Sequence, residues 1–170
     1  YGVTGSGKTQ VYVRLIQEAL SQGRTALVLV PEIILTPQLL RIFASHFGKR
    51  IAVLHSSLRA GERYDEWKRI RRGEAQVVIG TRSAIFAPLE NLGLIILDEE
   101  QEVSYKSENV PRYHAREVAK YRCFQNNALL VLGSATPSVE SMYLALAGKY
   151  ALFELRGRYN QRALPQVLVA

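Results

Sequence analysis

The segment that most constrains this chain is the glycine-rich run GVTGSGKT at residues 2–9, which matches the pattern G-x-x-x-x-G-K-[ST] at every fixed position. In such a loop the glycines let backbone N–H groups point at phosphate oxygens, the lysine reaches the β- and γ-phosphates, and the final hydroxyl coordinates Mg²⁺. The alternative is a glycine-rich loop that binds nothing. A loop without a ligand would not need so long a motif, nor an amphipathic helix directly after it, whose dipole favours an anion. The motif predicts a nucleotide site formed by Gly2, Val3, Thr4, Gly5, Ser6, Gly7, Lys8 and Thr9, with Thr9 also at the metal.

The composition limits the class of protein. With 170 residues, 48% of them apolar, the chain is long enough for one domain with a real core and is not a disordered tail. The formal charge of +7 favours a polyanionic partner such as nucleic acid, although charge alone is a weak signal. Cys123 has no second cysteine to pair with, and no Cys/His cluster has zinc spacing, so neither a disulfide nor a thiolate metal site is predicted.

The apolar runs are too short to predict a membrane span. The longest, at residues 26–35, is broken by Pro31 and Glu32, and no signal peptide is recognised. Only Tyr1 stands before the glycine-rich loop, where a buried strand normally leads into it. We therefore expect a fragment that begins just after its first strand and has no membrane partner.

Two kinds of apolar pattern alternate along the chain. Short apolar runs predict buried strands, and helical spacing predicts amphipathic helices between them. The predicted strands are 25–30, 51–54, 76–80, 92–97 and 128–132, with 150–155 as a candidate edge strand, and the predicted helices are 10–22, 37–47, 60–72, 112–126 and 139–146. This alternation implies right-handed crossovers, so the predicted fold class is α/β, a parallel sheet with helices on both faces.

Capping signals and apolar stripes refine the helices. Thr36-Pro37, and again Thr136-Pro137, place a capping hydroxyl before a proline at the first helical position. The stripes predicted to face the core include Tyr64, Trp67 and Ile70 in the third helix and Val139, Met142, Tyr143 and Leu146 in the last.

Polar residues follow each predicted strand. A ligand of a parallel α/β sheet sits outside the carboxyl ends of the strands, so these residues should lie along one edge beside the glycine-rich loop. They are Glu32, His55, Ser56, Thr81, Arg82, Ser83, Asp98, Glu99, Glu100, Gln101, Ser134 and Thr136. His55 is predicted to be structural, because nothing in phosphoryl transfer requires it.

The acidic cluster DEEQ at residues 98–101 is the second candidate site. A carboxylate at the end of a buried strand can hold Mg²⁺ through its waters, which is the role predicted for Asp98. The next carboxylate, Glu99, can orient and deprotonate an attacking water. Gln101 can hydrogen-bond a γ-phosphate or a hydroxyl, and Glu100 has no predicted role. The alternative is a solvated acidic turn.

The order of these motifs resembles that of a known superfamily. GVTGSGKT, PEIILTPQ, GTRSA, DEEQ and GSATPS look like motifs I, Ia, Ib, II and III of superfamily 2 helicases. With VLHSSL at 53–58 and SYKSENVPRYHARE at 104–117, they are similar to the primosomal N′ (PriA) family of bacterial replication-restart helicases. The resemblance covers essentially the whole chain. It implies the first RecA-like P-loop NTPase lobe of a DNA-dependent ATPase and 3′–5′ DNA helicase that acts at stalled forks, with ATP and Mg²⁺ as cofactors.

The resemblance also implies partners and a location. The partners would be single-stranded and forked DNA, other primosome proteins and single-strand-binding proteins, in the bacterial cytoplasm at the nucleoid. A zinc-binding segment would lie outside these residues, and residues 156–170 would begin the connection to a second lobe. Because that lobe supplies arginines worth roughly 10³ to 10⁵ in rate, the chain alone is expected to be inactive.

Roles at the ATP site follow from the same resemblance. Lys8 and Glu99 would be catalytic, and Gln101 stands where the family usually has His. That position is thought to link γ-phosphate sensing to Ser134 and Thr136. Glutamine can keep a hydrogen bond there, so its presence does not predict loss of ATPase function.

The DNA contacts would come from motifs Ia and Ib and from an aromatic-rich loop. The predicted DNA-binding residues are Thr36, Thr81, Arg82, Ser83, Tyr105, Arg112, Tyr113 and Arg116, with His114 in the same loop. Hydroxyl and guanidinium groups suit phosphate oxygens, and aromatic faces stack on bases. As alternatives, Arg82 can form a structural ion pair and Tyr113 can pack at a helix start.

Two other functions stay open. One is a different superfamily 2 translocase that acts on duplex DNA or RNA. The other is a non-catalytic DNA-docking module with a vestigial nucleotide site, against which the intact Lys8, Thr9, Asp98 and Glu99 argue.

Overall fold

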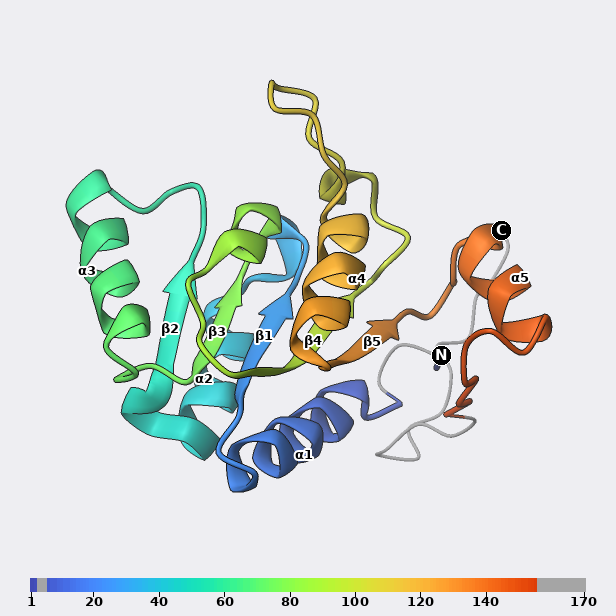
Figure 1. The fold of residues 1–170 in the computed structure, drawn as a ribbon, viewed down its shortest axis with the longest axis horizontal. Helices are drawn as coiled ribbons and strands as arrows, with labels where there is room; N and C mark the ends of the chain where they lie inside the picture. Colours follow the sequence, from blue (N-terminus) through green and yellow to red (C-terminus); the bar gives the residue numbers. More distant parts are fainter. Residues whose placement is uncertain (3–5, 156–170) are drawn as a thin grey trace, which may run out of the picture.

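The computed structural model describes residues 1–2 and 6–155, in which strands and helices alternate (Figure 1). The strands are β1 (Thr25–Leu29), β2 (Ile51–Leu54), β3 (Val77–Gly80), β4 (Leu92–Asp98) and β5 (Leu129–Gly133). The α-helices are α1 (Lys8–Ser21), α2 (Pro37–Phe47), α3 (Ala60–Arg71), α4 (Ala115–Asn126) and α5 (Val139–Leu146). Short 3₁₀ turns are η1 (Glu32–Ile34), η2 (Gly48–Arg50), η3 (Arg82–Phe86) and η4 (Val103–Tyr105).

The strands form one parallel sheet in the order β2-β3-β1-β4-β5. The central strands β1 and β4 are continuous apolar runs, TALVL and LGLIILD, whose apolar residues are buried. Such runs suit a parallel sheet covered on both faces, because successive side chains then point into opposite layers. The predicted α/β fold class, a parallel sheet with helices on both faces, is confirmed.

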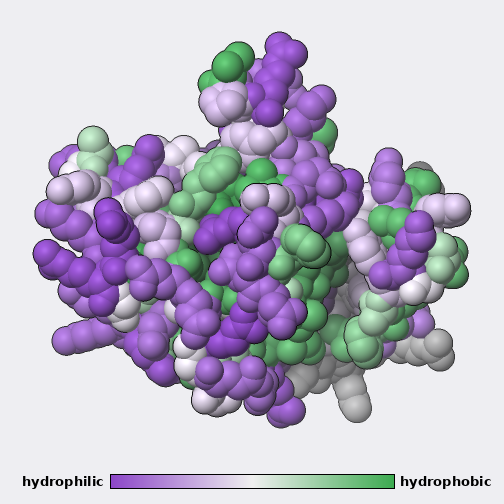
Figure 2. Space-filling model, in the orientation of Figure 1, coloured by the Kyte–Doolittle hydropathy of each residue, from purple (hydrophilic) through white to green (hydrophobic). Residues whose placement is uncertain are grey.

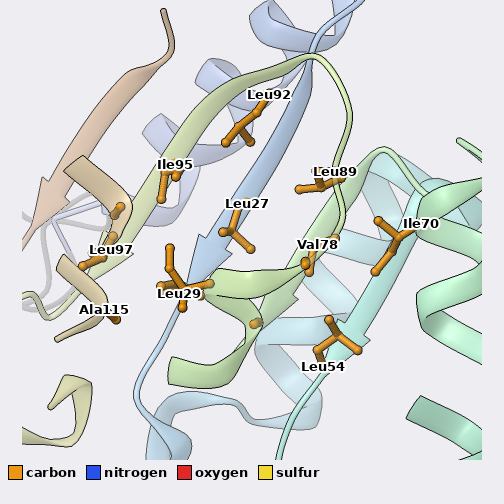
Figure 3. Close-up of a cluster of buried hydrophobic side chains, with 14 of the residues drawn as sticks. Leu27, Leu29, Leu54, Ile70, Val78, Leu89, Leu92, Ile95, Leu97 and Ala115 are labelled. Carbon is orange, nitrogen blue, oxygen red and sulfur yellow. The ribbon is translucent and has the colours of Figure 1, made fainter. Parts of the chain in front are cut away.

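Successive residues of β1 show how the two layers form. Leu27 and Leu29 belong to the cluster that contains side chains of α3, η3 and α4, whereas Ala26 and Val28 face α1 and α2. Figure 3 shows the first cluster, with Val78 of β3 beside Leu27. The helices therefore cover both faces of the sheet and leave the carboxyl ends of the strands for polar residues.

The predicted strands from 25–30 to 128–132 and all the predicted helices are present, with small shifts at their ends. The largest shift is in α4, which begins at Ala115 and not at residue 112. The residues before it form a hairpin loop, residues 106–114, closed by an antiparallel bridge between Lys106 and His114. His114 then caps the helix, because its Nδ1 accepts a hydrogen bond from the N–H of Arg116 at 3.2 Å.

The end of the described chain differs more from the prediction. The cap of α5 is Ser138 and not Thr136, since the Ser138 hydroxyl accepts a hydrogen bond from the N–H of Ser141 at 3.3 Å. The prediction of an edge strand at residues 150–155 is wrong. A single parallel bridge between Gly2 and Leu155 stands in its place.

Two predicted core stripes are wrong in part. Tyr64 of α3 is 61% exposed, and the ammonium of Lys68 lies 4.1 Å from the centre of its ring. Val139 and Tyr143 of α5 are 83% and 69% exposed. The buried residue of α5 is Ser141, so a polar contact and not an apolar stripe orients this helix, which lies beyond β5 in Figure 1. None of the described helices combines the length and the apolar character that crossing a membrane requires.

Candidate functional site

The glycine-rich loop approaches the carboxyl end of β5. The N–H of Gly2 donates to the C=O of Ser134 at 3.0 Å. A Cβ at Gly2 would lie 2.6 Å from Ser6 Oγ and 2.7 Å from Leu155 Cβ, so no side chain fits there. Gly7 caps α1 with a φ of 89°, a conformation that glycine adopts without strain. Val3, Thr4 and Gly5 lie outside the described residues.

Lys8 and Glu99 form an ion pair at the centre of the site. The distance from Nζ to Oε1 is 2.7 Å, and the side chains are 13% and 20% exposed. The φ of Glu99 is 47°, which is unusual for a residue with a side chain and bends the turn after β4. Burial alone would raise the pKa of Glu99, but hydrogen bonds from Lys8 and Gln101 outweigh it and hold the pKa below its usual value. Thr9 follows in the first turn of α1 and is partly buried.

Asp98 ends β4 and is partly buried. Its Oδ1 accepts a hydrogen bond from the hydroxyl of Tyr12 at 2.7 Å. Its backbone C=O accepts one from the hydroxyl of Tyr105 at 2.6 Å. Burial raises the pKa of Asp98 above its usual value, even though Tyr12 and Lys8 favour the charged form.

Gln101 links the acidic cluster to the segment after β5. Its Nε2 donates to Oε2 of Glu99 at 3.1 Å, and its Oε1 accepts from the Ser134 hydroxyl at 2.6 Å. Ser134 Oγ in turn accepts from the N–H of Thr136 at 2.9 Å. A continuous polar path therefore runs from Lys8 through Glu99 and Gln101 to the residues that follow β5.

Glu100 faces a different network. Its side chain is 1% exposed, and it accepts hydrogen bonds from Arg116 Nη1 at 2.9 Å, from Ser141 Oγ at 3.0 Å and from the N–H of Ser138 at 2.7 Å. Burial would raise the pKa of Glu100, but these donors lower it. Arg116 is 16% exposed and committed to this carboxylate, so the prediction that it binds DNA does not fit the structure.

The predicted DNA-binding residues after β1 and β3 differ in exposure. Thr36 and Ser83 are exposed, and Thr36 Oγ1 also caps α2. Thr81 is only 8% exposed. Arg82 is partly buried, and its Nη1 donates to the C=O of Lys106 at 2.6 Å. Among the described residues Arg82 forms no ion pair, so the alternative proposed for it is not observed; instead it ties η3 to the hairpin loop.

The hairpin loop protrudes beyond α4 in Figure 1, and its surface is a mixture of hydrophilic and hydrophobic groups in Figure 2. Arg112 is exposed on it. Tyr113 is partly buried and packs edge-on against Phe86, with 4.9 Å between ring centroids. Arg82 lies 5.9 Å from the same ring. Tyr113 thus packs at the base of the loop, which is the alternative that its position before a helix suggested.

Tyr105 requires a correction. It is 1% exposed, and its hydroxyl donates to the C=O of Leu29 at 3.0 Å as well as to that of Asp98. A ring in this position has no free face for a base, so the prediction of a DNA contact does not fit the structure. Tyr105 instead holds the carboxyl ends of β1 and β4 together.

Three residues of this region were not singled out from the sequence. The sequence patterns predict no site role for Tyr12, Glu100 or Phe86. The spacing of Lys8 and Tyr12, four residues apart on one helix, was a signal that both face the same site. No comparable local signal distinguishes Glu100 from Glu99.

The residues present fit a phosphate chain and a hard cation. Ser6 Oγ is buried and has no hydrogen-bond partner among the described residues, two positions before the Lys8 ammonium. Asp98 and Glu99 supply carboxylate oxygens, which hard cations prefer. Within residues 1–2 and 6–155 no group of three or more His, Cys, Asp or Glu could hold a metal by itself.

Known proteins share both the sequence and the fold. Residues 1–144 match the DEAD/DEAH box helicase family. The chain is 54% identical over 167 residues to the replication restart protein PriA of Bacillus subtilis (strain 168), covering 98% of this chain and 21% of that protein. It is 52% identical over 169 residues to the PriA of Treponema pallidum (strain Nichols), covering 99% and 26%. The chain thus spans about a fifth to a quarter of the length of these relatives.

A solved structure supports the same assignment. RecG bound to a three-way DNA junction matches with a TM-score of 0.64 and 28% identity, over 91% of this chain and 20% of that chain. The fold is that of a RecA-like helicase lobe, and the chain belongs to the DEAD/DEAH box helicase family.

Proposed function

We propose that this chain is the ATP-binding lobe of a DNA-dependent ATPase and 3′–5′ DNA helicase that acts at stalled replication forks, in replication restart and primosome assembly. The observation that carries the proposal is the polar path from Lys8 through Glu99 and Gln101 to Ser134. It joins the glycine-rich loop to the acidic cluster and to the end of the next strand. Such a connection is needed if nucleotide binding is to affect the binding of a partner. The similarity to PriA proteins and the net charge of +7 support DNA as that partner.

The residues of the path have separate roles in the proposed reaction. Lys8 binds the β- and γ-phosphates, and in doing so it exchanges Glu99 for phosphate oxygens. The released carboxylate of Glu99 can then accept a proton from the attacking water. Asp98, through waters, and Thr9, through its hydroxyl, hold Mg²⁺, which when bound neutralises the charge of the phosphates. Because Gln101 contacts both Glu99 and Ser134, it transmits the release of Glu99 from Lys8 to Ser134.

The DNA-binding surface is proposed for the carboxyl edge of the sheet and the hairpin loop. Thr36, Ser83 and Arg112 are exposed there and can contact phosphate oxygens. Thr81 and Arg82 support the same edge from partly or fully buried positions. The proposed ligands are single-stranded and forked DNA. Other primosome proteins and single-strand-binding proteins are proposed as protein partners, in the bacterial cytoplasm at the nucleoid, and zinc only for a segment outside this sequence.

The test is ATP turnover by the full-length protein that contains this chain, with and without a DNA fork. We expect strong stimulation by forked or single-stranded DNA, and its loss in Lys8→Ala. Glu99→Gln should keep nucleotide binding but lose turnover by at least about 10²-fold, the size typical of a general base. Turnover that ignores DNA, or that is unchanged in Glu99→Gln, would contradict the proposal.

The same assay separates the two other functions. Stimulation by duplex DNA or RNA above that by forked DNA would indicate a different translocase of the superfamily. DNA binding that persists with no ATP binding at all would indicate a docking module. The 170 residues alone are proposed to be inactive, because arginines of a second lobe complete such sites.

A further inference from the structure

Tyr12 is a buried polar side chain to which the proposed reaction assigns no role. It lies in α1 one turn after Lys8 and is 4% exposed. Its ring packs in the core layer between α1 and the sheet, where phenylalanine would serve as well. Its hydroxyl, however, donates to Oδ1 of Asp98 at 2.7 Å. The hydroxyl therefore contacts a carboxylate of the proposed metal site.

Gly133 makes room for this hydroxyl. It lies opposite Asp98 in the register of β4 and β5. A Cβ at this position would lie 1.8 Å from the Tyr12 hydroxyl and 2.9 Å from its ring carbon. The φ of Gly133 is not in the left-handed region, so the backbone conformation does not require glycine here. Space for the phenol is what requires it.

The chemistry of the contact suits a permanent donor. The Tyr12 hydroxyl donates a hydrogen bond to Oδ1 of Asp98 from a buried position. A buried carboxylate without donors would be costly, and a hydrogen bond to a charged acceptor is stronger than one between neutral groups. The phenol thus restricts the rotation of the Asp98 carboxylate and leaves that carboxylate negatively charged.

We propose that Tyr12 is a positioning residue for the Mg²⁺–nucleotide site: its hydroxyl holds the Asp98 carboxylate in one orientation, and Gly133 keeps the space for it open. The inference rests on the proposed function. Residues that orient metal-binding groups typically contribute roughly 10- to 100-fold to metal affinity. The effect should appear in Mg²⁺ dependence and not in metal-free nucleotide binding.

Tyr105 provides a matched control. Its hydroxyl also donates to Asp98, but to the backbone C=O and not to the carboxylate. Both phenols are almost fully buried, at 4% and 1% exposure. Tyr12→Phe and Tyr105→Phe both remove a buried hydroxyl, the first from the carboxylate of Asp98 and the second from the backbone C=O groups of Asp98 and Leu29.

The experiment measures binding of a fluorescent, non-hydrolysable ATP analogue to the full-length protein while Mg²⁺ is titrated, with a second series in EDTA. Mn²⁺ binding followed by electron paramagnetic resonance provides a direct metal readout. We expect Tyr12→Phe to raise the half-saturating Mg²⁺ and Mn²⁺ concentrations by about 10-fold or more. Analogue binding in EDTA should stay unchanged, and Tyr105→Phe should leave the metal titrations unchanged.

Two results would overturn the inference while leaving the proposed function intact. One is an unaltered metal dependence in Tyr12→Phe. The other is an equal shift in Tyr105→Phe, which would indicate a general displacement of β4. If the unsubstituted protein bound the analogue with no Mg²⁺ dependence at all, the proposed function itself would be wrong, and the role of Tyr12 would be refuted with it.

Discussion

The acidic cluster at residues 98–101 and the hairpin loop at residues 106–114 are close in the chain but are built in opposite ways. In the acidic cluster each carboxylate is bonded within the protein, and Glu100 is 2% exposed. In the hairpin loop Val110 is 89% exposed, and the base is held by Arg82 and by the contact of Tyr113 with Phe86. A substitution of the enclosed Glu100 should therefore disturb folding, whereas one at an exposed position of the loop should disturb contact with a partner alone.

The two regions are joined through α4, which begins at the end of the loop and carries Arg116 to Glu100. Neighbouring glutamates consequently have different surroundings. Glu99 is paired with Lys8, whose ammonium can exchange this carboxylate for a phosphate. Glu100 is enclosed by Arg116, Ser138 and Ser141, none of which a nucleotide can replace. Within the cluster itself, the side chain of Glu99 is 20% exposed and that of Glu100 is 1% exposed, in keeping with the catalytic role proposed for the first and a structural role for the second.

The largest effect is expected from Arg116→Ala, which leaves Glu100 buried without its cation. Breaking a buried ion pair by removing one partner costs about 3–5 kcal/mol. Denaturant unfolding of the full-length protein would measure the loss. Glu100→Gln/Arg116→Gln removes both charges and should cost less than Arg116→Ala. An exposed ion pair contributes at most about 1 kcal/mol to stability. If Arg116→Ala lowered the free energy of unfolding by less than that, Glu100 and Arg116 would not form an enclosed pair.

The next effect is expected from Gly133→Ala. Its methyl group would collide with Tyr12, and overpacking of this kind costs about 1–3 kcal/mol. The loss should shrink in the Tyr12→Phe background, because the closest atom is then absent. Gly61→Ala in α3 is the matched control, since its methyl group meets nothing within 4 Å and should not destabilise the protein. If Gly133→Ala lowered the unfolding midpoint equally in the unsubstituted and the Tyr12→Phe background, the packing argument would be contradicted.

A smaller and different effect is expected in the hairpin loop. Arg112→Ala should weaken binding of single-stranded DNA and reduce the salt dependence by about one phosphate contact. Stability should change by less than about 0.5 kcal/mol, because Arg112 is exposed. Fluorescence anisotropy over a range of salt concentrations measures both affinity and slope. Arg71→Ala, at an exposed arginine on α3, is the control for charge alone. If it weakened DNA binding as much as Arg112→Ala does, the hairpin loop would not be part of the DNA-binding surface.

The smallest effect is a pH dependence at His114, where the loop meets α4. Burial, Arg116 and Lys120 lower the pKa of His114 below its ordinary value of 6.5, against the opposing charges of Glu117 and Glu100. The unfolded chain therefore takes up this proton first as pH falls. The stability that neutral His114 gives to the folded protein is therefore complete above pH 6.5, and it is lost as pH falls through the folded-state pKa of His114. His114→Asn keeps a capping side chain without the titration, and its stability profile should be flatter in this range.

The strands, the helices and the place of the glycine-rich loop before α1 follow from the sequence alone. Runs such as LGLIIL suit a strand covered on both faces, because successive side chains then point into opposite apolar layers. Thr36 and Pro37 likewise mark the start of α2, whereas the same pair of residue types at 136–137 does not start α5, whose cap is Ser138. The juxtaposition of Lys8 with the acidic cluster followed from the parallel topology, which brings the carboxyl ends of the strands to one edge.

The surroundings of individual side chains at that edge, in contrast, depend on tertiary packing. The left-handed turn at Glu99 brings one carboxylate to Lys8, while the next is enclosed against Arg116. Tyr105 is buried by packing against β1, although its aromatic-rich segment resembles a DNA-binding loop. Such outcomes depend on backbone direction at single residues and on contacts between distant segments. Local apolar patterns and motif spacing carry neither kind of information, so side-chain roles at the site emerge only once the chain is packed.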